Sequence, residues 1–261
     1  MEGVAENIFG GKGILMENCA VLFGSKSACY EKNAKIQREI AEETIKFAAG
    51  NISQIKNGLW LDIGSGTGFV QKELSKNFGK INIVSLDISL LPLLQKENCV
   101  CGDFDNLAFA DNSFDKIISC SALQWSKNIE NALRNSFDAL KTGGKLIIAI
   151  FENGTLEKLQ FLQKKFGIKS LVSFYEQKYL DEILQKTGFE IIVKNERIFS
   201  QKFVCAYDAL KSISKIGAAN HGSTILSPKA LKNFVAQYEK LFASGEIIHD
   251  YKTLFYISEK K

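Results

Sequence analysis

The feature that most constrains the fold is a glycine-rich loop directly behind a short apolar segment. Leu59–Ile63 has the length and composition of a buried strand, and Gly64-Ser65-Gly66-Thr67-Gly68 follows it. The next residues, Phe69–Asn77, have the length and periodicity of a helix. A strand, a glycine loop and a helix in this order place backbone N–H groups at the mouth of a helix, where a ligand can approach them. The alternative is a tight turn that binds nothing.

Short apolar runs and helical stretches continue to alternate behind this loop, which predicts an α/β fold with a doubly wound, mostly parallel sheet. The further strand candidates are Ile81–Leu86, Lys116–Cys120, Lys145–Phe151, Phe189–Val193 and Tyr251–Ser258. The helix candidates are Ala28–Ala49, Ile129–Leu140, Leu156–Lys165, Gln177–Lys186 and two pieces within Tyr207–Phe242 that are separated around Gly217–Pro228. We expect Gly50 and Asn51 to end the first helix and Lys141-Thr142-Gly143-Gly144 to form a tight turn.

The length of 261 residues fits one large domain better than two. We expect residues 1–20 to form a loose tail and residues 21–261 to form a single domain. Helical additions at about residues 153–175 and 205–244 are expected to lie as a lid over the ligand-binding end of the sheet.

Acidic residues follow three successive strand candidates. Asp62 stands just before the glycine loop, Asp87 closes the next strand, and Asp103 follows Cys101-Gly102 at the end of another. A carboxylate at the position of Asp87 can accept hydrogen bonds from two neighbouring ribose hydroxyls, although capping the next helix is an alternative role. Asp103 can accept a hydrogen bond from an adenine amino group, and Phe104 can cover the ring.

The spacing of the glycines separates two kinds of cofactor. A dinucleotide site needs G-x-G-x-x-G, but Phe69 stands where that pattern requires its third glycine. Asp62 is also better placed for the cationic amino-acid part of a ligand than for a pyrophosphate. The pattern therefore favours the sulfonium cofactor S-adenosylmethionine over NAD.

Composition excludes several other classes of function. The net charge is only +4, and three arginines among 33 basic residues supply few bidentate contacts to bases, so no nucleic acid is expected as a partner. No run of eighteen apolar residues is present, so no membrane span is expected. The six cysteines include no C-x-x-C pair, which predicts reduced thiols in a cytoplasmic protein and no metal site.

With these residues placed, Leu59–Ile150 resembles the class I methyltransferases. A wider resemblance, over about residues 20–258, is to the malonyl-acyl-carrier-protein O-methyltransferase family of biotin synthesis. It is carried by Phe23-Gly24, Tyr30-Glu31, Ala34, Gln37, Ser121-Ala122-Leu123-Gln124-Trp125 and Ile216-Gly217-Ala218. Two positions depart from that family: Cys120 replaces its usual asparagine, and Ser214 with Lys215 replaces a lysine near the Ile216 turn.

The resemblance implies a seven-stranded class I sheet and methyl transfer from S-adenosylmethionine to the free carboxylate of a malonyl thioester, carried by acyl-carrier protein or coenzyme A. It implies S-adenosylhomocysteine as the product and no metal. The predicted cofactor-binding residues are Asp62, Gly64, Ser65, Gly66, Gly68, Asp87, Ile88, Asp103, Phe104 and Cys120. Tyr30 and Gln124 are the predicted catalytic residues. Tyr30 orients the carboxylate or closes the cofactor pocket, Gln124 donates a hydrogen bond to the substrate, and Trp125 forms an apolar wall. Ordinary packing is the alternative role for Tyr30 and Trp125.

Lysines in the C-terminal helical region suggest a docking face for an acidic carrier protein, with a merely solvated surface as the alternative. They are Lys211, Lys215, Lys229 and Lys232. Three other functions remain open: methylation of another small acid or quinone precursor, binding of the cofactor without catalysis as a partner subunit or sensor, and an NAD-dependent reaction.

Overall fold

A computed structural model describes residues 30–93, 96–107, 109–168, 172, 174–215, 227–242 and 245–261. The expected N-terminal tail and the Ile216-Gly217-Ala218 element lie outside these residues. Within the described part of the chain, no helix is long and apolar enough to cross a membrane.

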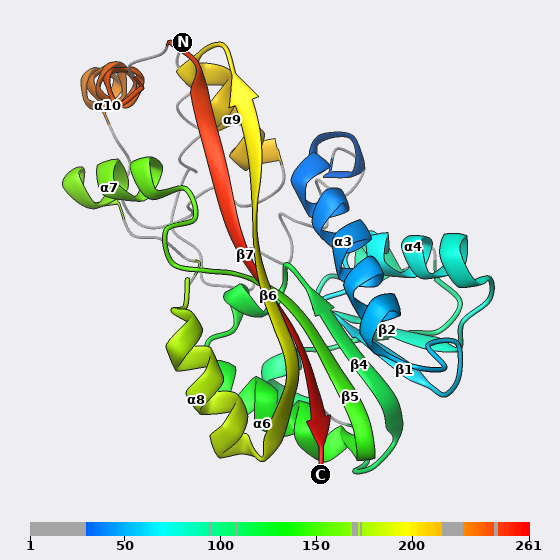
Figure 1. The fold of residues 1–261 in the computed structure, drawn as a ribbon. Helices are drawn as coiled ribbons and strands as arrows, with labels where there is room; N and C mark the ends of the chain where they lie inside the picture. The colour runs from blue at the N-terminus through cyan, green and yellow to red at the C-terminus, as the bar shows by residue number, and fades with distance from the viewer. Residues whose placement is uncertain are drawn as a thin grey trace.

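Seven strands form one sheet in the order β3-β2-β1-β4-β5-β7-β6, as Figure 1 shows. Their bounds are β1 Trp60–Ile63, β2 Ile83–Asp87, β3 Cys99–Cys101, β4 Phe114–Cys120, β5 Leu140–Phe151, β6 Phe189–Phe203 and β7 Ile247–Lys260. The first five strands are parallel, and β7 runs antiparallel to both β5 and β6. The strand order reverses between β1 and β4, and ligands of open α/β sheets bind in the crevice at such a point. The predicted doubly wound, mostly parallel seven-stranded sheet is confirmed.

Helices cover both faces of the sheet (Figure 1). The helices are α3 Lys35–Asn51, α4 Phe69–Phe78, α5 Leu90–Leu93, α6 Ile129–Ala139, α7 Glu157–Lys165, α8 Gln177–Thr187, α9 Ala206–Lys215 and α10 Pro228–Lys240. Two short 3-10 turns, η1 Phe104–Asn106 and η2 Leu123–Trp125, follow β3 and β4. Side chains of successive β5 residues alternate between two cores, because Ile147 packs with α3 and α4 while Ile148 packs with α6 and α8.

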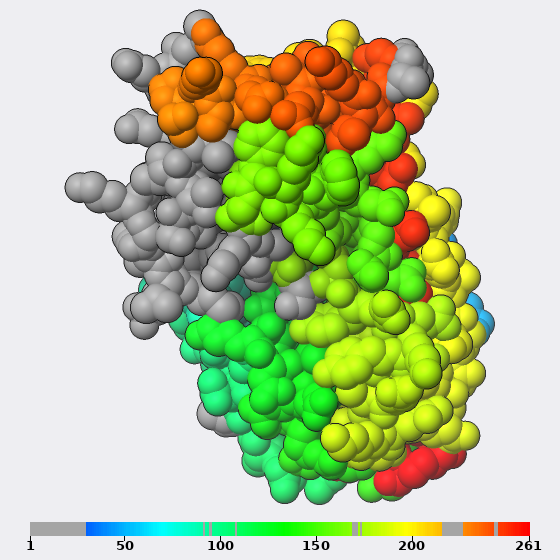
Figure 2. All heavy atoms as spheres, turned by 90° about the vertical axis from the view of Figure 1, so that its left-hand side faces the viewer, coloured from blue at the N-terminus to red at the C-terminus, as the bar shows by residue number. Residues whose placement is uncertain are grey.

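The antiparallel strands β6 and β7 extend beyond the parallel part of the sheet and support a separate helical layer. This layer has its own apolar cluster, in which Leu162 of α7, Leu210 of α9 and Phe234 of α10 pack with Ile247 of β7. Figure 2 shows α10 lying across the end of the molecule with α7 beside it. The layer thus stands at the edge where the parallel strands end.

Several boundaries differ from the sequence expectations. The residues expected to form a tight turn, Lys141–Gly144, belong to β5, which starts at Leu140. The first helix is interrupted at Ala34, and Gly50 and Asn51 are its last two residues rather than its stop. β6 is ten residues longer than expected because it is an edge strand with many exposed polar side chains, so its sequence is not an apolar run.

Candidate active site

The glycine loop connects β1 to α4 through three residues with left-handed backbone. The φ angles are +69° at Gly64, +47° at Gly66 and +86° at Gly68, the residue that caps α4. A Cβ added at Gly64 would lie 2.3 Å from the Cβ of Ala122, in the segment that follows β4. Glycine is therefore required at position 64 by both backbone conformation and space.

Asp87 ties the end of β2 to this loop. One carboxylate oxygen accepts a hydrogen bond from the Gly66 N–H at 2.8 Å, and the other accepts from the Ser89 N–H at 2.8 Å. Burial raises the pKa of Asp87, and these two backbone donors oppose the rise. Each carboxylate oxygen retains a lone pair, so Asp87 can both fix the loop and accept ligand hydroxyls.

Asp62, at the end of β1, is the least satisfied acid of the site. Its side chain is 1% exposed, and its Oδ2 has no hydrogen-bond partner within the described residues. Burial raises the pKa of this carboxyl to about 7, while the nearby Lys96 cation opposes the rise and Asp87 adds to it. A buried carboxylate without a donor fits a cationic ligand group such as an ammonium.

Lys96 is a component of the site that the sequence did not reveal. Its ammonium donates to the Ser65 hydroxyl at 2.8 Å and to the Ser65 carbonyl at 3.3 Å. Burial lowers the pKa of Lys96, and the charges of Asp62 and Asp87 counteract this. Lys96 lies behind the loop rather than on the cavity, and no motif around it indicated this contact.

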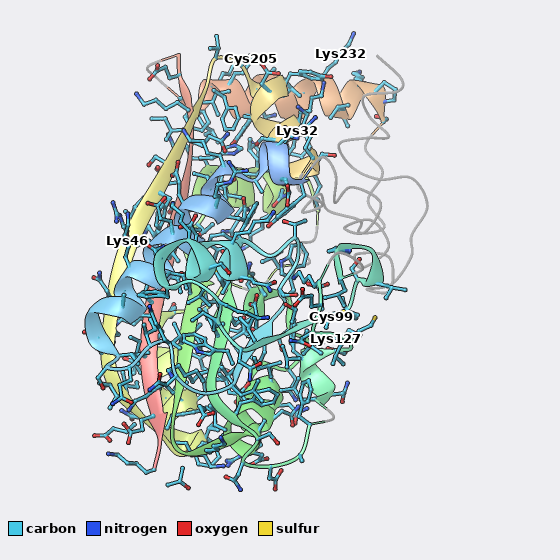
Figure 3. The ribbon with its side chains drawn as sticks, turned by 90° about the vertical axis from the view of Figure 1, so that its right-hand side faces the viewer. Lys32, Lys46, Cys99, Lys127, Cys205 and Lys232 are labelled. Carbon is cyan, nitrogen blue, oxygen red and sulfur yellow. The ribbon has the colours of Figure 1, made fainter. Side chains whose placement is uncertain are left out.

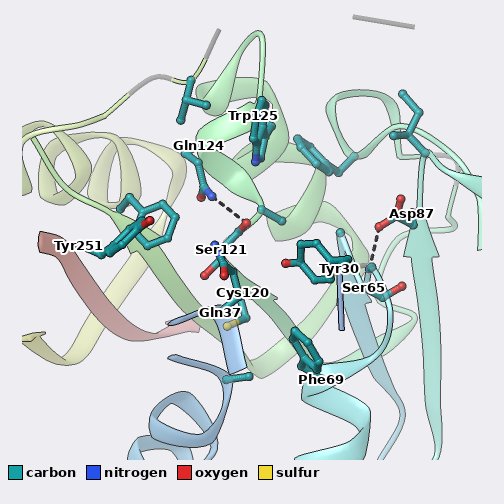
Figure 4. Close-up of a pocket in the computed structure, with 18 of the residues that line it drawn as sticks. Tyr30, Gln37, Ser65, Phe69, Asp87, Cys120, Ser121, Gln124, Trp125 and Tyr251 are labelled. Carbon is teal, nitrogen blue, oxygen red and sulfur yellow. Dashed lines mark hydrogen bonds between the residues drawn. The ribbon is translucent and has the colours of Figure 1, made fainter. Parts of the chain in front are cut away.

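One cavity extends from the glycine loop toward the helical layer, and Figure 4 shows its lining. All of the predicted site residues except Gly68 line it. They are Tyr30, Asp62, Gly64, Ser65, Gly66, Asp87, Ile88, Asp103, Phe104, Cys120 and Gln124. The structure thus brings these residues together, and their individual roles remain predictions. Gly68 instead shapes the start of α4.

The acid and the thiol at the other strand ends have local partners. Asp103 accepts a hydrogen bond from the Asp105 N–H at 2.9 Å and caps η1, with Phe104 beside it on the cavity. The Cys120 sulfur lies 3.6 Å from the Thr44 hydroxyl of α3. Burial raises the pKa of the Cys120 thiol to about 12, so it stays protonated at neutral pH.

The two predicted catalytic residues lie in different surroundings. Tyr30 stacks on Phe69 with ring centroids 5.7 Å apart, and burial raises the pKa of its hydroxyl. Gln124 donates from its Nε2 to the Ser121 carbonyl at 2.7 Å, and its buried Oε1 has no partner among the described residues. One amide hydrogen of Gln124 is therefore already committed to the backbone. Trp125, which was predicted to form an apolar wall, also lines the cavity.

The far half of the cavity was not predicted residue by residue. It is lined by apolar side chains from β5, α7, α9 and the segment between α7 and α8. These are Phe151, Leu156, Leu159, Phe174 and Ile213. The same half contains Tyr251 of β7, so the helical layer and the antiparallel hairpin both contribute to the site. The only sequence signal for this was the expectation of a lid.

Comparison with known proteins matches this site to a family. Residues 61–148, which span β1 to β5, match a family model described as a methyltransferase domain. The malonyl-acyl-carrier-protein O-methyltransferase of Bacillus cereus is 29% identical over 251 residues, covering 89% of this chain and 93% of its own. These likenesses support an S-adenosylmethionine-dependent methyltransferase with the class I fold.

Two further proteins are similar to this methyltransferase over most of its length. The biotin biosynthesis bifunctional protein BioHC of Cellvibrio japonicus is 25% identical over 228 residues, covering 84% of this chain and 45% of its own. A crystal structure of a Bacillus halodurans protein assigned as a methyltransferase covers 84% of this chain and 98% of its own, with a TM-score of 0.61 and 14% identity. The structural likeness supports the fold, and the sequence likeness extends into the helical layer.

The residues of this methyltransferase fit S-adenosylmethionine, the cofactor that the enzyme uses. Asp62 has a buried carboxylate oxygen with no hydrogen-bond partner among the described residues, which fits the ammonium group of the cofactor. Asp87 stands beside the glycine loop with lone pairs left for ribose hydroxyls. Three left-handed glycines keep the loop free of side chains between these two acids.

Proposed function

We propose that this methyltransferase converts the free carboxylate of a malonyl thioester to its methyl ester in biotin synthesis. The observation that carries the proposal is a cavity with the predicted cofactor-binding residues at one end and an apolar lining from the helical layer at the other. An apolar far end suits the thioester-linked arm that carries the malonyl group. The relatives with this activity align along most of the chain, including the lid helices.

The chemistry needs little from the protein beyond orientation and exclusion of water. S-adenosylmethionine supplies a methyl carbon whose bond to sulfur breaks as its bond to the carboxylate oxygen forms, with the electron pair passing to the sulfur of S-adenosylhomocysteine. A carboxylate is already ionised at pH 7, so no general base or Lewis-acid metal is required to activate it. The apolar walls of the cavity remove water from the reacting groups, and the lid holds them together.

The decisive test is product analysis. The enzyme is incubated with S-adenosylmethionine and with malonyl thioesters of acyl-carrier protein or coenzyme A, and the thioesters are analysed by mass spectrometry. We expect a methyl ester on at least one malonyl thioester and none on the corresponding acetyl thioester, which lacks the carboxylate. Methylation of neither malonyl thioester would overturn the proposal, and a parallel panel of other small acids would then identify the acceptor.

Tyr30 is the first residue to test, because we propose that its hydroxyl orients the substrate carboxylate. The Tyr30→Phe variant keeps the stacking on Phe69 and loses only the hydroxyl. We expect turnover to fall about 10-fold or more, the scale of a hydrogen bond to a charged group, while S-adenosylhomocysteine binding stays within about 2-fold of the wild type. Unchanged kcat and KM would assign Tyr30 to packing.

The exposed lysines of α9 and α10 provide a docking face for the carrier protein. Lys211 and Lys215 lie on α9 and Lys229 and Lys232 on α10, all exposed, and Figure 3 shows Lys232 pointing away from the molecule. Acyl-carrier proteins are acidic, so we expect the double variant Lys211→Glu/Lys232→Glu to raise KM for malonyl carrier protein about 10-fold at low salt. The same variant is expected to leave malonyl-coenzyme A turnover unchanged.

The control for this charge reversal is Lys178→Glu on α8, an exposed lysine that is not part of the helical layer. It should affect neither substrate. Equal loss on both substrates in the α9/α10 variant would remove the docking face from the proposal.

The described cysteines, Cys99, Cys101, Cys120 and Cys205, are free thiols, so we place the reaction in the reducing cytoplasm.

A further inference from the structure

Two polar side chains in the middle of the cavity have no hydrogen-bond partner among the residues that the structure describes. Gln37 of α3 is 8% exposed and Tyr251 of β7 is 4% exposed, and both line the cavity. Neither forms a side-chain hydrogen bond within the part of the chain that the structure describes. Their polar ends are not among the fully buried atoms and open onto the cavity, where a polar group of a ligand can supply the missing hydrogen bonds.

Their location identifies the part of the ligand that they meet. In Figure 4, Tyr251 lies on the side of Ser121 and Cys120 that is away from the glycine loop and Asp87, and Gln37 lies beside Cys120. Phe151 packs against Tyr251 with ring centroids 5.5 Å apart, so the apolar half of the cavity starts at this tyrosine. The pair therefore stands between the cofactor end and the apolar end, where a group that receives the methyl must lie.

Both side chains are neutral hydrogen-bond donors. The amide of Gln37 has two N–H hydrogens, and the Tyr251 hydroxyl stays protonated because burial raises its pKa. Among the described residues that line the cavity, Lys127 is the one cation, and its side chain is exposed to solvent. An anionic group in the middle of the cavity can therefore accept hydrogen bonds from the neutral Gln37 amide and Tyr251 hydroxyl, rather than pair with a buried positive charge.

Neutral donors suit the reaction better than a buried cation. The substrate carboxylate loses its negative charge as the ester forms, so a fixed cation would stabilise the substrate more than the transition state. An amide and a hydroxyl also hold the carboxylate in place. Their interaction with it weakens less than that of a cation as the negative charge disappears.

We propose that Gln37 and Tyr251 form the recognition site for the acceptor carboxylate and determine the preference for malonyl over acetyl thioesters. This inference rests on the proposed function, because it adds these two residues to Tyr30 as contacts of that substrate's carboxylate.

The test measures binding without turnover. Isothermal titration in saturating S-adenosylhomocysteine compares malonyl-coenzyme A with acetyl-coenzyme A, which differs by the carboxylate alone. We expect the wild type to prefer malonyl-coenzyme A, and Gln37→Met and Tyr251→Phe each to weaken its binding about 10-fold, the scale of a hydrogen bond to a charged group. Acetyl-coenzyme A binding and S-adenosylhomocysteine binding are expected to stay within about 2-fold of the wild type.

Gln37→Glu provides an opposite perturbation, since a carboxylate at this position repels the substrate carboxylate and should weaken malonyl-coenzyme A further than Gln37→Met does. Gln185→Met on the exposed surface of α8 is the matched control and should change neither affinity. If the wild type methylates malonyl thioesters but the variants keep its malonyl preference, the inference is wrong and the proposed function stands. If the wild type neither methylates nor prefers the malonyl thioester, the proposed function itself fails.

Discussion

Replacing Gly64 with valine is expected to abolish cofactor binding. The valine Cβ would stand 2.3 Å from the Cβ of Ala122, and a β-branched residue would have to adopt a φ of +69°. Backbone strain and overpacking each cost about 1–3 kcal/mol, so the loop must move away from the segment behind β4. We expect S-adenosylhomocysteine affinity, measured by isothermal titration, to fall at least about 100-fold, since roughly 2.7 kcal/mol of distortion gives that factor.

The matched control for this substitution is Gly79→Val, at the end of α4. Gly79 has a φ of +76°, but a Cβ there meets nothing within 4 Å. The control variant therefore shares the backbone strain without the collision and is expected to lose stability in urea unfolding while it retains cofactor affinity. Equal binding losses in the two variants would show that strain alone, and not the contact between the loop and Ala122, decides the result.

The second large effect is expected from Asp62→Asn. This change should raise the stability of the protein without ligand and lower its affinity for S-adenosylhomocysteine. The variant removes a buried carboxylate whose Oδ2 is unpartnered in the described residues, so the protein without ligand should become more stable above pH 7. The same change removes the anion that we assign to the ammonium of the cofactor. S-adenosylhomocysteine affinity is therefore expected to fall about 10- to 100-fold.

The pH dependence of this stability difference follows from the raised pKa of Asp62. Its value of about 7 in the folded protein exceeds the ordinary value of 3.8, so the folded state binds a proton more readily than the unfolded chain. Wild-type stability is consequently lost as the pH rises from about 4 to about 7, whereas the asparagine variant does not titrate here. The advantage of the variant should be near zero at pH 4 and reach at most about 4 kcal/mol at pH 8.

Urea unfolding at pH 4, 6 and 8 measures this difference, and Asp111→Asn at an exposed turn provides the control with no expected effect. The charges that face Asp62 are Asp87, which adds to the rise in its pKa, and Lys96, which opposes it. A variant that is less stable than the wild type at pH 8 would show that the Asp62 carboxylate has a structural partner.

The parallel half of the fold and the gathering of the glycine loop and strand-end acids on one cavity were predictable because their signals are local. The apolar run before Gly64, the glycine spacing and the acids after three strands all lie within single strand-loop-helix units. The apolar half of the cavity depends instead on long-range pairing. Tyr251 reaches the cavity because β7 inserts between β5 and β6, and no spacing in the sequence indicates that Tyr251 and Gln37 line one cavity.

Lys96 illustrates a different limit of sequence reasoning. A lysine near a strand end is ordinarily a solvated surface residue, and its neighbours form no motif that distinguishes it. Only the folded structure places its ammonium against Ser65 and near two buried acids. Similarly, the length of β6 was hidden because an edge strand with exposed polar residues lacks the apolar run by which buried strands were found.

The position of β7 in the sheet has a consequence for how the protein is made. Ribosomes synthesise β5 and β6 before β7, yet these strands have no direct pairing with each other and each pairs only with β7 on this side. The edges of both strands therefore stay unpaired on the nascent chain until the codons for Ile247–Lys260 have been translated. A chaperone that shields newly made strand edges would be needed most during this interval, and Tyr251 cannot reach the cavity before it ends.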